Sequence, residues 1–281
     1  MAVKAAFIGA CGATLRHVLA WTLLDGHKAA AREFNIPILF GSQANSSYIV
    51  VRDHSKLKKT LLDLGVSEEI QQSQLTVITG SSRDLATVRS LLLSDPEIIF
   101  SGITSTWKLR FNPFHPIAMD DATITGDSAA AVMQALKDLV STNSISNKPI
   151  YAPISSTGHG SRRDQPLSLI PFYWWLLKEA QADTATLERI TREAATQKQS
   201  YLGGYIMLRP PLLTDGEMKG TTKVHTGWIW EDDVLRKSDE QEAGIKVGYT
   251  ISRMDLARWI FEELIQGDVQ SWNGKCVNLV Y

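Results

Sequence analysis

Short apolar runs alternate with longer stretches of helical spacing along the first 210 residues of the chain. Most of these runs are continuously apolar rather than alternating, which is typical of strands whose sheet is covered by helices on both faces. Strands that alternate with helices in this way predict βαβ units, and therefore an α/β fold built on a doubly wound parallel sheet. Six strands are predicted, at residues 3–8, 48–52, 75–79, 97–100, 149–154 and 205–208.

The stretches between the strands differ in regularity. Apolar residues at helical intervals run from Leu15 to Leu23, and Gly26 is expected to end that helix. A long helix is expected around residues 129–139. Residues 29–47 do not fit the scheme and are interpreted as an insertion of unassigned purpose. Residues from about 210 to 250, rich in Gly, Lys and Trp, predict an irregular substrate-side lobe within one domain spanning residues 1–281.

Composition narrows the function classes. Hydrophobic residues make up 44% and charged residues 21% of the chain, and the net charge is −1, so nothing favours binding to nucleic acid or to an anionic membrane. The two cysteines, Cys11 and Cys276, form no disulfide framework and fit a reducing compartment. No segment has the pattern of a secretion signal or a membrane span, so a cytoplasmic location is expected. No metal-ligand spacing occurs, and no metal is predicted.

The first predicted strand runs directly into a glycine turn of sequence GACGATL at residues 9–15. A pyrophosphate needs close backbone approach and free N–H groups at a helix N-terminus. Gly9 and Gly12 supply the approach, with Cys11 between them, and the amides of Ala13, Thr14 and Leu15 supply the N–H groups. Leu15 replaces the third glycine of the usual dinucleotide pattern, so helix and strand are expected to sit slightly further apart. The alternative is a plain tight turn.

The end of the second predicted strand bears on which dinucleotide binds. An NAD site generally has a carboxylate there for the ribose 2′-hydroxyl. Here the strand ends in Arg52, and Lys56 follows one helical turn later, which suits the 2′-phosphate of NADP(H). Asp53 favours NAD instead, and a solvated basic helix start is a further alternative. We predict NADP(H) as the cofactor.

The glycine turn resembles the G-A-T-G-A-T-G opening of atypical short-chain dehydrogenases, in the NmrA-like and flavin-reductase-like group. Further segments resemble that family in the same order: PISSTG at 153–158, LRPPLLT at 208–214, ISRMDLA at 251–257 and the closing strand at 274–281. The similarity spans nearly the whole chain and is greatest to fungal members. It implies a Rossmann fold with a small C-terminal substrate region.

The resemblance implies further cofactor contacts beyond the glycine turn. Gly102, Ile103 and Thr104, after the fourth strand, would pass under the nicotinamide-side ribose and phosphate, and Gly102 permits the close approach. Asp84 would lie near the adenine, although an aspartate there is equally suited to cap a helix. The remaining contacts that the resemblance implies are Ser155 and Pro210.

Catalysis in most short-chain dehydrogenases depends on Tyr-x-x-x-Lys, which is absent, because no tyrosine of this chain has a lysine four positions later. The resemblance implies that Ser156 and Thr157 orient the substrate, with Tyr173 as a possible donor. The alternative is that these hydroxyls only close the strand and contact the cofactor. His159 is either a proton shuttle or incidental.

An aromatic segment at 171–177, together with Trp228 and Trp230, suits either an apolar pocket or helix packing. We therefore predict an NADP(H)-dependent oxidoreductase, a reductase or dehydrogenase, acting on a small carbonyl compound of aromatic or polyketide-like character. Its partner would be that small molecule, and the protein would be a monomer or homodimer. Two alternatives stay open: a redox-sensing regulator of the NmrA type, and an isomerase or dehydratase on the same fold.

Overall fold

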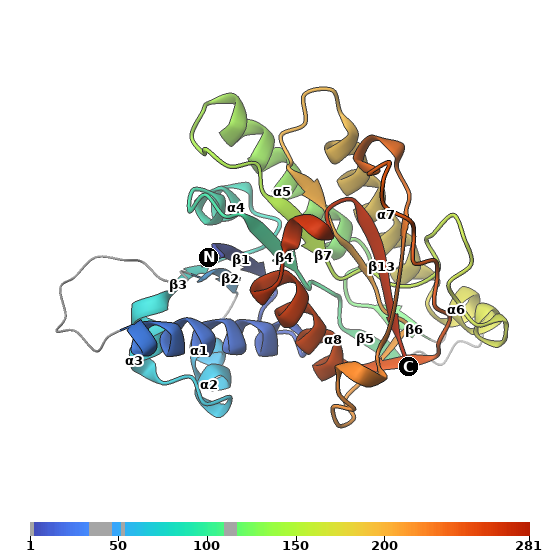
Figure 1. The fold of residues 1–281 in the computed structure, drawn as a ribbon, viewed down its shortest axis with the longest axis horizontal. Coiled ribbons are helices and arrows are strands. Elements are labelled where there is room, and N and C mark those ends of the chain that lie inside the picture. The colour runs from blue at the N-terminus through green and yellow to red at the C-terminus, as the bar shows by residue number, and fades with distance from the viewer. Residues whose placement is uncertain (1–2, 34–46, 52–53, 110–116) are drawn as a thin grey trace.

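A six-stranded parallel sheet forms the centre of the computed structural model (Figure 1), which describes residues 3–33, 47–51, 54–109 and 117–281. The strand order is β3-β2-β1-β4-β7-β8, and every neighbouring pair is parallel. The predicted α/β fold is confirmed. The strands are β1 (Ala5–Ile8), β2 (Ser47–Val51), β3 (Leu75–Thr79), β4 (Ile98–Ser101), β7 (Ile150–Pro153) and β8 (Gly204–Tyr205).

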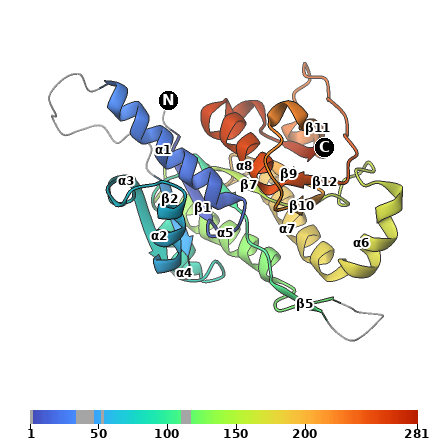
Figure 2. The same cartoon turned by 90° about the horizontal axis from the view of Figure 1, so that it is seen from below.

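Helices cover both faces of this sheet. The helices are α1 (Leu15–Glu33), α2 (His54–Asp63), α3 (Glu68–Gln74), α4 (Leu85–Leu92), α5 (Ile124–Ser141), α6 (Ile170–Leu176), α7 (Lys178–Thr196) and α8 (Arg253–Ile260). Short 3₁₀ turns lie at Leu167–Leu169, Thr221–Lys223, Asp233–Leu235 and Val269–Ser271, and a π-helical stretch, Phe261–Gln266, follows α8. Helix α1 lies beside α8 on one face, and α4, α5 and α7 cover the other (Figures 1 and 2).

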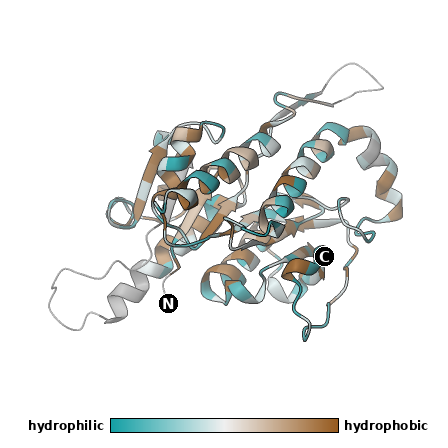
Figure 3. Cartoon of the chain, turned by 90° about the horizontal axis from the view of Figure 1, so that it is seen from above, coloured by the Kyte–Doolittle hydropathy of each residue, from teal (hydrophilic) through white to brown (hydrophobic). Residues whose placement is uncertain are grey.

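The sequence of β1 is continuously apolar because its side chains enter the core on both faces of the sheet. Ala5 and Phe7 point into the core under α1 and α8, whereas Ala6 and Ile8 point into the core under α4, α5 and α7. Successive side chains of a strand point to opposite faces, so a strand between two helical layers needs apolar residues at every position. The hydropathy colouring follows the same pattern, with brown on the central strands and teal on many outward helix positions (Figure 3).

The prediction that Gly26 ends the first helix is wrong, because α1 continues to Glu33. One glycine inside a helix costs only about 1 kcal/mol relative to alanine. The residues that follow, HKAAARE, are mostly good helix formers and offset that cost. The helix therefore takes up the start of the predicted insertion at 29–47, whose residues 34–46 lie outside the described part of the chain.

The C-terminal part of the chain adds smaller sheets. The predicted sixth strand divides after Tyr205, and β9 (Met207–Arg209) leaves to pair with β13 (Lys275–Val280), which also pairs with β11 (His225–Trp230). Strands β10 (Leu212–Thr214) and β12 (Thr250–Ser252) form a parallel pair, so short strands occur within residues 210–250. A hairpin of β5 (Trp107–Leu109) and β6 (Ile117–Met119) projects from the body of the molecule (Figure 2). No helix in the described part of the chain is long and apolar enough to cross a membrane.

Candidate active site

The glycine turn between β1 and α1 is tight and leaves backbone donors without an acceptor among the described residues. The Gly12 amide donates to the Gly9 carbonyl at 2.9 Å, and Gly9 has φ +82°, a conformation that favours glycine. The amides of Ala13, Thr14 and Leu15 donate no hydrogen bond to any described group. Free N–H groups at the start of a long helix are what an anionic phosphate requires.

Gly102 provides the room that the leucine at position 15 needs. Leu15 is buried, and a Cβ built on Gly102 would lie 2.8 Å from Leu15 Cδ1. A Cβ on Gly9 would likewise lie 3.0 Å from Ile103 Cδ1 and 3.1 Å from the Gly102 carbonyl carbon. The loops after β1 and β4 therefore touch backbone to backbone, and the missing side chain of Gly102 accommodates the leucine that replaces the third glycine.

A cavity of about 680 Å³ opens over this turn, a size in the range of small-molecule and cofactor sites. It lies at the carboxyl ends of β1 and β4, where the strand order reverses and doubly wound sheets bind nucleotides. Seven of the predicted cofactor residues come together in its wall: Gly9, Cys11, Gly12, Lys56, Gly102, Ile103 and Thr104. Arg52 and Asp53 lie outside the described residues.

Sequence reasoning did not identify Arg83, which also lines this cavity. Its guanidinium donates to Asp121 at 2.6 Å and pairs with Asp127 at 2.9 Å. The hydrogen bond with Asp121 is the main reason that the pKa of Arg83 is raised. An arginine in the loop after the third strand, three residues beyond Gly80, was the available signal. Asp121 follows β6 and Asp127 lies in the first turn of α5, so Arg83 ties the loop after β3 to these two elements.

Asp84, the predicted adenine contact, caps helix α4. Its carboxylate accepts from the Thr87 amide at 2.9 Å and from the Thr87 hydroxyl at 2.5 Å, and these bonds lower its pKa. It does not belong to the described lining of the cavity. The alternative that an aspartate here serves as a helix cap is the one that this geometry favours.

The hydroxyl row after β7 points in several directions. Ser155 donates to Glu188 Oε1 at 2.5 Å and is buried. The Thr157 amide donates to the carbonyl of Pro210 at 3.1 Å, and Pro210 is buried as well. Neither Ser155 nor Pro210 is therefore brought to the glycine-turn cavity. Ser156 is partly exposed and contacts His159.

Thr157 and Tyr173 are neighbours in the interior. Thr157 is 1% exposed, and its Oγ1 makes no hydrogen bond of normal geometry with a described group. Tyr173 is 5% exposed, and burial raises the pKa of its phenol, while the nearby Thr157 hydroxyl opposes that rise. Asp164 adds to it through its charge. The structure thus brings together two of the three predicted catalytic residues.

A buried ion network lies behind the hydroxyl row. Arg209, only 1% exposed, donates to Glu188 Oε2 at 2.6 Å and to Glu231 Oε1 at 2.9 Å. Burial opposes the charge of Arg209, but the two carboxylates hold its pKa well above the ordinary value. Asp183 accepts from the Thr125 and Gly126 amides at the start of α5. These acidic residues are occupied by structural partners. Within the described ranges, no group of three His, Cys, Asp or Glu side chains gathers to hold a metal.

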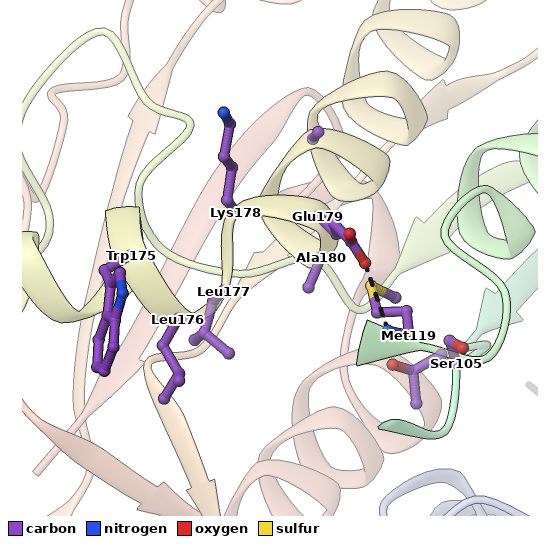
Figure 4. Close-up of a pocket in the computed structure, with 10 residues that line it drawn as sticks. Ser105, Met119, Trp175, Leu176, Leu177, Lys178, Glu179 and Ala180 are labelled. Atoms are coloured by element: carbon purple, nitrogen blue, oxygen red, sulfur yellow. Dashed lines mark hydrogen bonds between the residues drawn. The ribbon is translucent and has the colours of Figure 1, made fainter. Parts of the chain in front are cut away.

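A second cavity, of about 270 Å³, shares one lining residue, Thr104, with the first. Its walls are mainly apolar and come from the end of α6, the start of α7 and the β5–β6 hairpin (Figure 4). In that view Leu176 and Leu177 point the same way, and Glu179 points to Met119, whose amide donates to Glu179 Oε2 at 3.3 Å. The residues that line it are Thr104, Ser105, Met119, Trp175, Leu176, Leu177, Lys178, Glu179, Ala180 and Ala182.

The aromatic residues predicted to line a pocket separate into two groups. Trp175, from the segment at 171–177, lines the second cavity. Trp228 and Trp230 instead pack edge to face in the core, with ring centroids 5.7 Å apart. The Lys275 ammonium lies 3.9 Å from the Trp228 ring centroid, so these two rings stabilise β11 against β13 through packing and a cation–π contact.

Comparison with known proteins places this architecture among redox enzymes. No family model matches the sequence. The chain is 32% identical to Reductase pytE of Aspergillus terreus over 287 aligned residues, covering 98% of this chain and 97% of the relative. It is 26% identical to Oxidase pynE of Aspergillus niger over 303 aligned residues, with the same coverage of 98% and 97%.

Two solved structures share the whole fold. A short-chain dehydrogenase/reductase from Veillonella parvula, in complex with NADP, superposes with a TM-score of 0.61 at 17% identity, over 100% of this chain and 95% of the other. ChuY, an anaerobilin reductase from Escherichia coli O157:H7, superposes with a TM-score of 0.56 at 16% identity, over 99% and 96%. At these identities the likeness concerns the fold.

Proposed function

Because the chain belongs to the family of the fungal reductase pytE, we propose that it is an NADP(H)-dependent oxidoreductase that acts on a small carbonyl compound. The observation that carries the proposal is the 680 Å³ cavity over a glycine turn with free helix N-terminal amides, at the switch point of the sheet. The relatives support redox chemistry, since one is named a reductase and another an oxidase. The structural neighbour with bound NADP supports the choice of cofactor.

The residues of the cavity fit a dinucleotide. Gly9, Gly12 and Gly102 leave open the positions that a Cβ would fill, and the amides of Ala13, Thr14 and Leu15 at the start of α1 would bind the pyrophosphate. Lys56 stands on α2 in the cavity wall, where its ammonium would bind the 2′-phosphate, together with Arg52 from the adjoining stretch. A bound NADPH would supply the hydride.

The second cavity is the proposed substrate site. Its lining of Met119, Trp175, Leu176 and Leu177 suits a flat apolar compound, which supports an aromatic or polyketide-like carbonyl. Thr104 would lie between the reacting parts of cofactor and substrate. Ser156 and Thr157 would orient the carbonyl, with Tyr173 as a further donor, where the substrate extends beyond the lining of this cavity, which includes none of the three. We also assign the chain to the NmrA-like branch, as one cytoplasmic domain with a substrate-side lobe.

The cofactor proposal is tested by titrating NADPH and NADH and following nucleotide fluorescence. Lys56→Glu should weaken NADPH binding by at least tenfold and leave NADH within about twofold, since a lost charge–phosphate contact is worth about 1.5–3 kcal/mol. Lys59→Glu, an exposed position on the same helix outside the cavity lining, is the matched control. Equal loss of both nucleotides, or tighter binding of NADH by the unaltered protein, would overturn the 2′-phosphate assignment.

Turnover is tested with NADPH and a panel of quinones, flavins and aromatic ketones. Oxidation of NADPH by an aromatic carbonyl supports the reductase. Tight NADPH binding without turnover on any member would favour the redox-sensing regulator instead. Conversion of a substrate without net change in NADPH would favour the isomerase or dehydratase.

A further inference from the structure

The Ser156 hydroxyl has an unusual set of partners. The amide nitrogen of Gln181 donates to Ser156 Oγ at 3.1 Å, and His159 Nε2 lies 3.2 Å from the same oxygen. The Gln181 nitrogen also reaches the carbonyl oxygen of Thr157 at 3.4 Å, so both of its contacts are acceptors and the orientation of this amide is consistent. Gln181 thus occupies one lone pair of Ser156 with a fixed donor.

A serine oxygen has two lone pairs and one hydrogen. When His159 carries its hydrogen on Nε2, it fills the second lone pair, and the Ser156 hydrogen is left without an acceptor among the described residues. When Nε2 is bare, the serine donates to it instead. The Ser156–His159 hydrogen bond can therefore run in either direction. In the first arrangement Gln181 and His159 both donate to Ser156 Oγ, so the serine hydrogen is available to a substrate.

His159 connects this serine to a third cavity. The cavity has a volume of about 350 Å³, which is room for roughly ten waters at about 30 Å³ each. It is lined by His159, Ala185, Glu188, Arg189, Arg192, Glu193, Thr196 and Asp232.

Charged groups from two elements act on the ring of His159. Burial lowers the pKa of the imidazole below its ordinary 6.5, and Arg209 of β9 lowers it further, while Glu188 of α7 opposes them. In the cavity wall, Arg192 is held by Asp232 at 2.9 Å and Arg189 by Glu193 at 3.0 Å. Burial and Arg209 therefore favour the neutral form of the ring, which can carry its hydrogen on either nitrogen.

We propose that His159 is a proton-relay residue that links the water of this third cavity to the Ser156 hydroxyl, which protonates the substrate. The inference rests on the proposed reductase function. As the carbonyl carbon takes the cofactor's hydride, the carbonyl oxygen takes the hydrogen of Ser156. Ser156 Oγ takes the hydrogen of His159 Nε2, and Nδ1 takes one from water. The sum is one hydride and one solvent proton added across the carbonyl, and oxidation of an alcohol runs the same steps in reverse.

The test separates relay from simple hydrogen bonding. His159→Gln keeps a donor toward Ser156 but has no second site for a proton, so it should lower kcat by about 10²-fold and raise the solvent deuterium isotope effect. NADPH binding, measured by fluorescence, should stay within twofold. His159→Ala should regain activity with added imidazole, in a saturable manner, because the third cavity admits a ring of that size. His225→Gln, at an exposed position on β11, is the matched control.

A second readout does not depend on turnover. Nitrogen-15 NMR of the NADP-bound protein should show His159 neutral at pH 7, with both tautomers in exchange. A charged ring at pH 7 would overturn the relay. So would wild-type kcat and isotope effect in His159→Gln, or a folded, NADPH-binding His159→Ala that imidazole does not rescue. Failure of the unaltered protein to reduce any carbonyl would instead contradict the proposed function, and the NMR result would still decide whether His159 can relay protons.

Discussion

The contact between Leu15 and Gly102 provides a quantitative test of how the cofactor turn is built. In Gly102→Ala the new methyl would stand 2.8 Å from Leu15 Cδ1 and 3.0 Å from Leu15 Cγ. Favourable carbon–carbon contacts begin near 3.5 Å, so the leucine would have to retreat by about 0.7 Å. Leu15 is only 1% exposed, so it cannot move without displacing its neighbours in the core. We therefore expect the free energy of unfolding to fall by about 1–3 kcal/mol, the usual cost of overpacking.

The partner substitution identifies the cause. Leu15→Ala alone should cost about 2–5 kcal/mol, because it leaves a cavity. In the double variant the methyl of residue 102 enters the space that the leucine has left, so the two costs should not add, and their coupling should be about 1–3 kcal/mol. Urea denaturation of all four proteins, followed by tryptophan fluorescence, measures this cycle.

The control for this cycle is Gly216→Ala. A Cβ at Gly216 has Thr214 Oγ1 as its nearest neighbour, at 3.9 Å, so this variant should stay within about 0.5 kcal/mol of wild type. Strict additivity of Gly102→Ala and Leu15→Ala, within about 0.5 kcal/mol, would show that the leucine does not depend on the glycine. The account of how the turn tolerates a leucine would then be refuted.

Three further predictions concern the buried polar groups. Arg209→Met should cost about 3–5 kcal/mol at pH 7, since Glu188 and Glu231 stay buried without their cation, as urea denaturation would measure. Burial raises the pKa of Glu231, but hydrogen bonds from Arg209 and the Ser161 amide outweigh burial and leave that pKa lowered. The stabilisation by Glu231 is therefore present above its ordinary pKa of 4.5 and is lost as the pH falls through the lower, folded-state pKa. A pH titration of wild-type unfolding in which acid conditions fail to reduce stability would contradict this. Asp183→Ala should cost about 1–2 kcal/mol by removing the acceptor at the start of α5, whereas Asp183→Asn should recover part of it, as thermal unfolding would measure.

The sheet could be predicted because its signal is local. A strand buried on both faces is apolar at every position, and β3 begins and ends at the predicted residues. The glycine turn was identifiable for the same reason, since its conformation depends on neighbouring residues. The division between β8 and β9 could not be predicted, because β9 leaves the sheet to pair with β13, nearly seventy residues later.

The directions of the polar side chains in the site could not be predicted from the sequence. Ser155 and Ser156 are adjacent in sequence, yet one faces Glu188 and the other His159. Their directions depend on α7 and on the loop after β7, which the motif alone does not contain. The role of Arg83 could not be predicted, because only the folded chain brings its partners Asp121 and Asp127 to it. Local sequence thus located the cleft, and long-range packing decided which side chains face it.

Thr104 lines both the larger and the smaller cavity. A family that diversified its substrates by altering this position would alter its affinity for the nucleotide at the same time. Changes in α6 or in the β5–β6 hairpin would leave the affinity for the nucleotide unaltered, because those elements line only the smaller cavity. New substrate preferences would therefore arise more easily at the outer wall of the smaller cavity than at the end of β4.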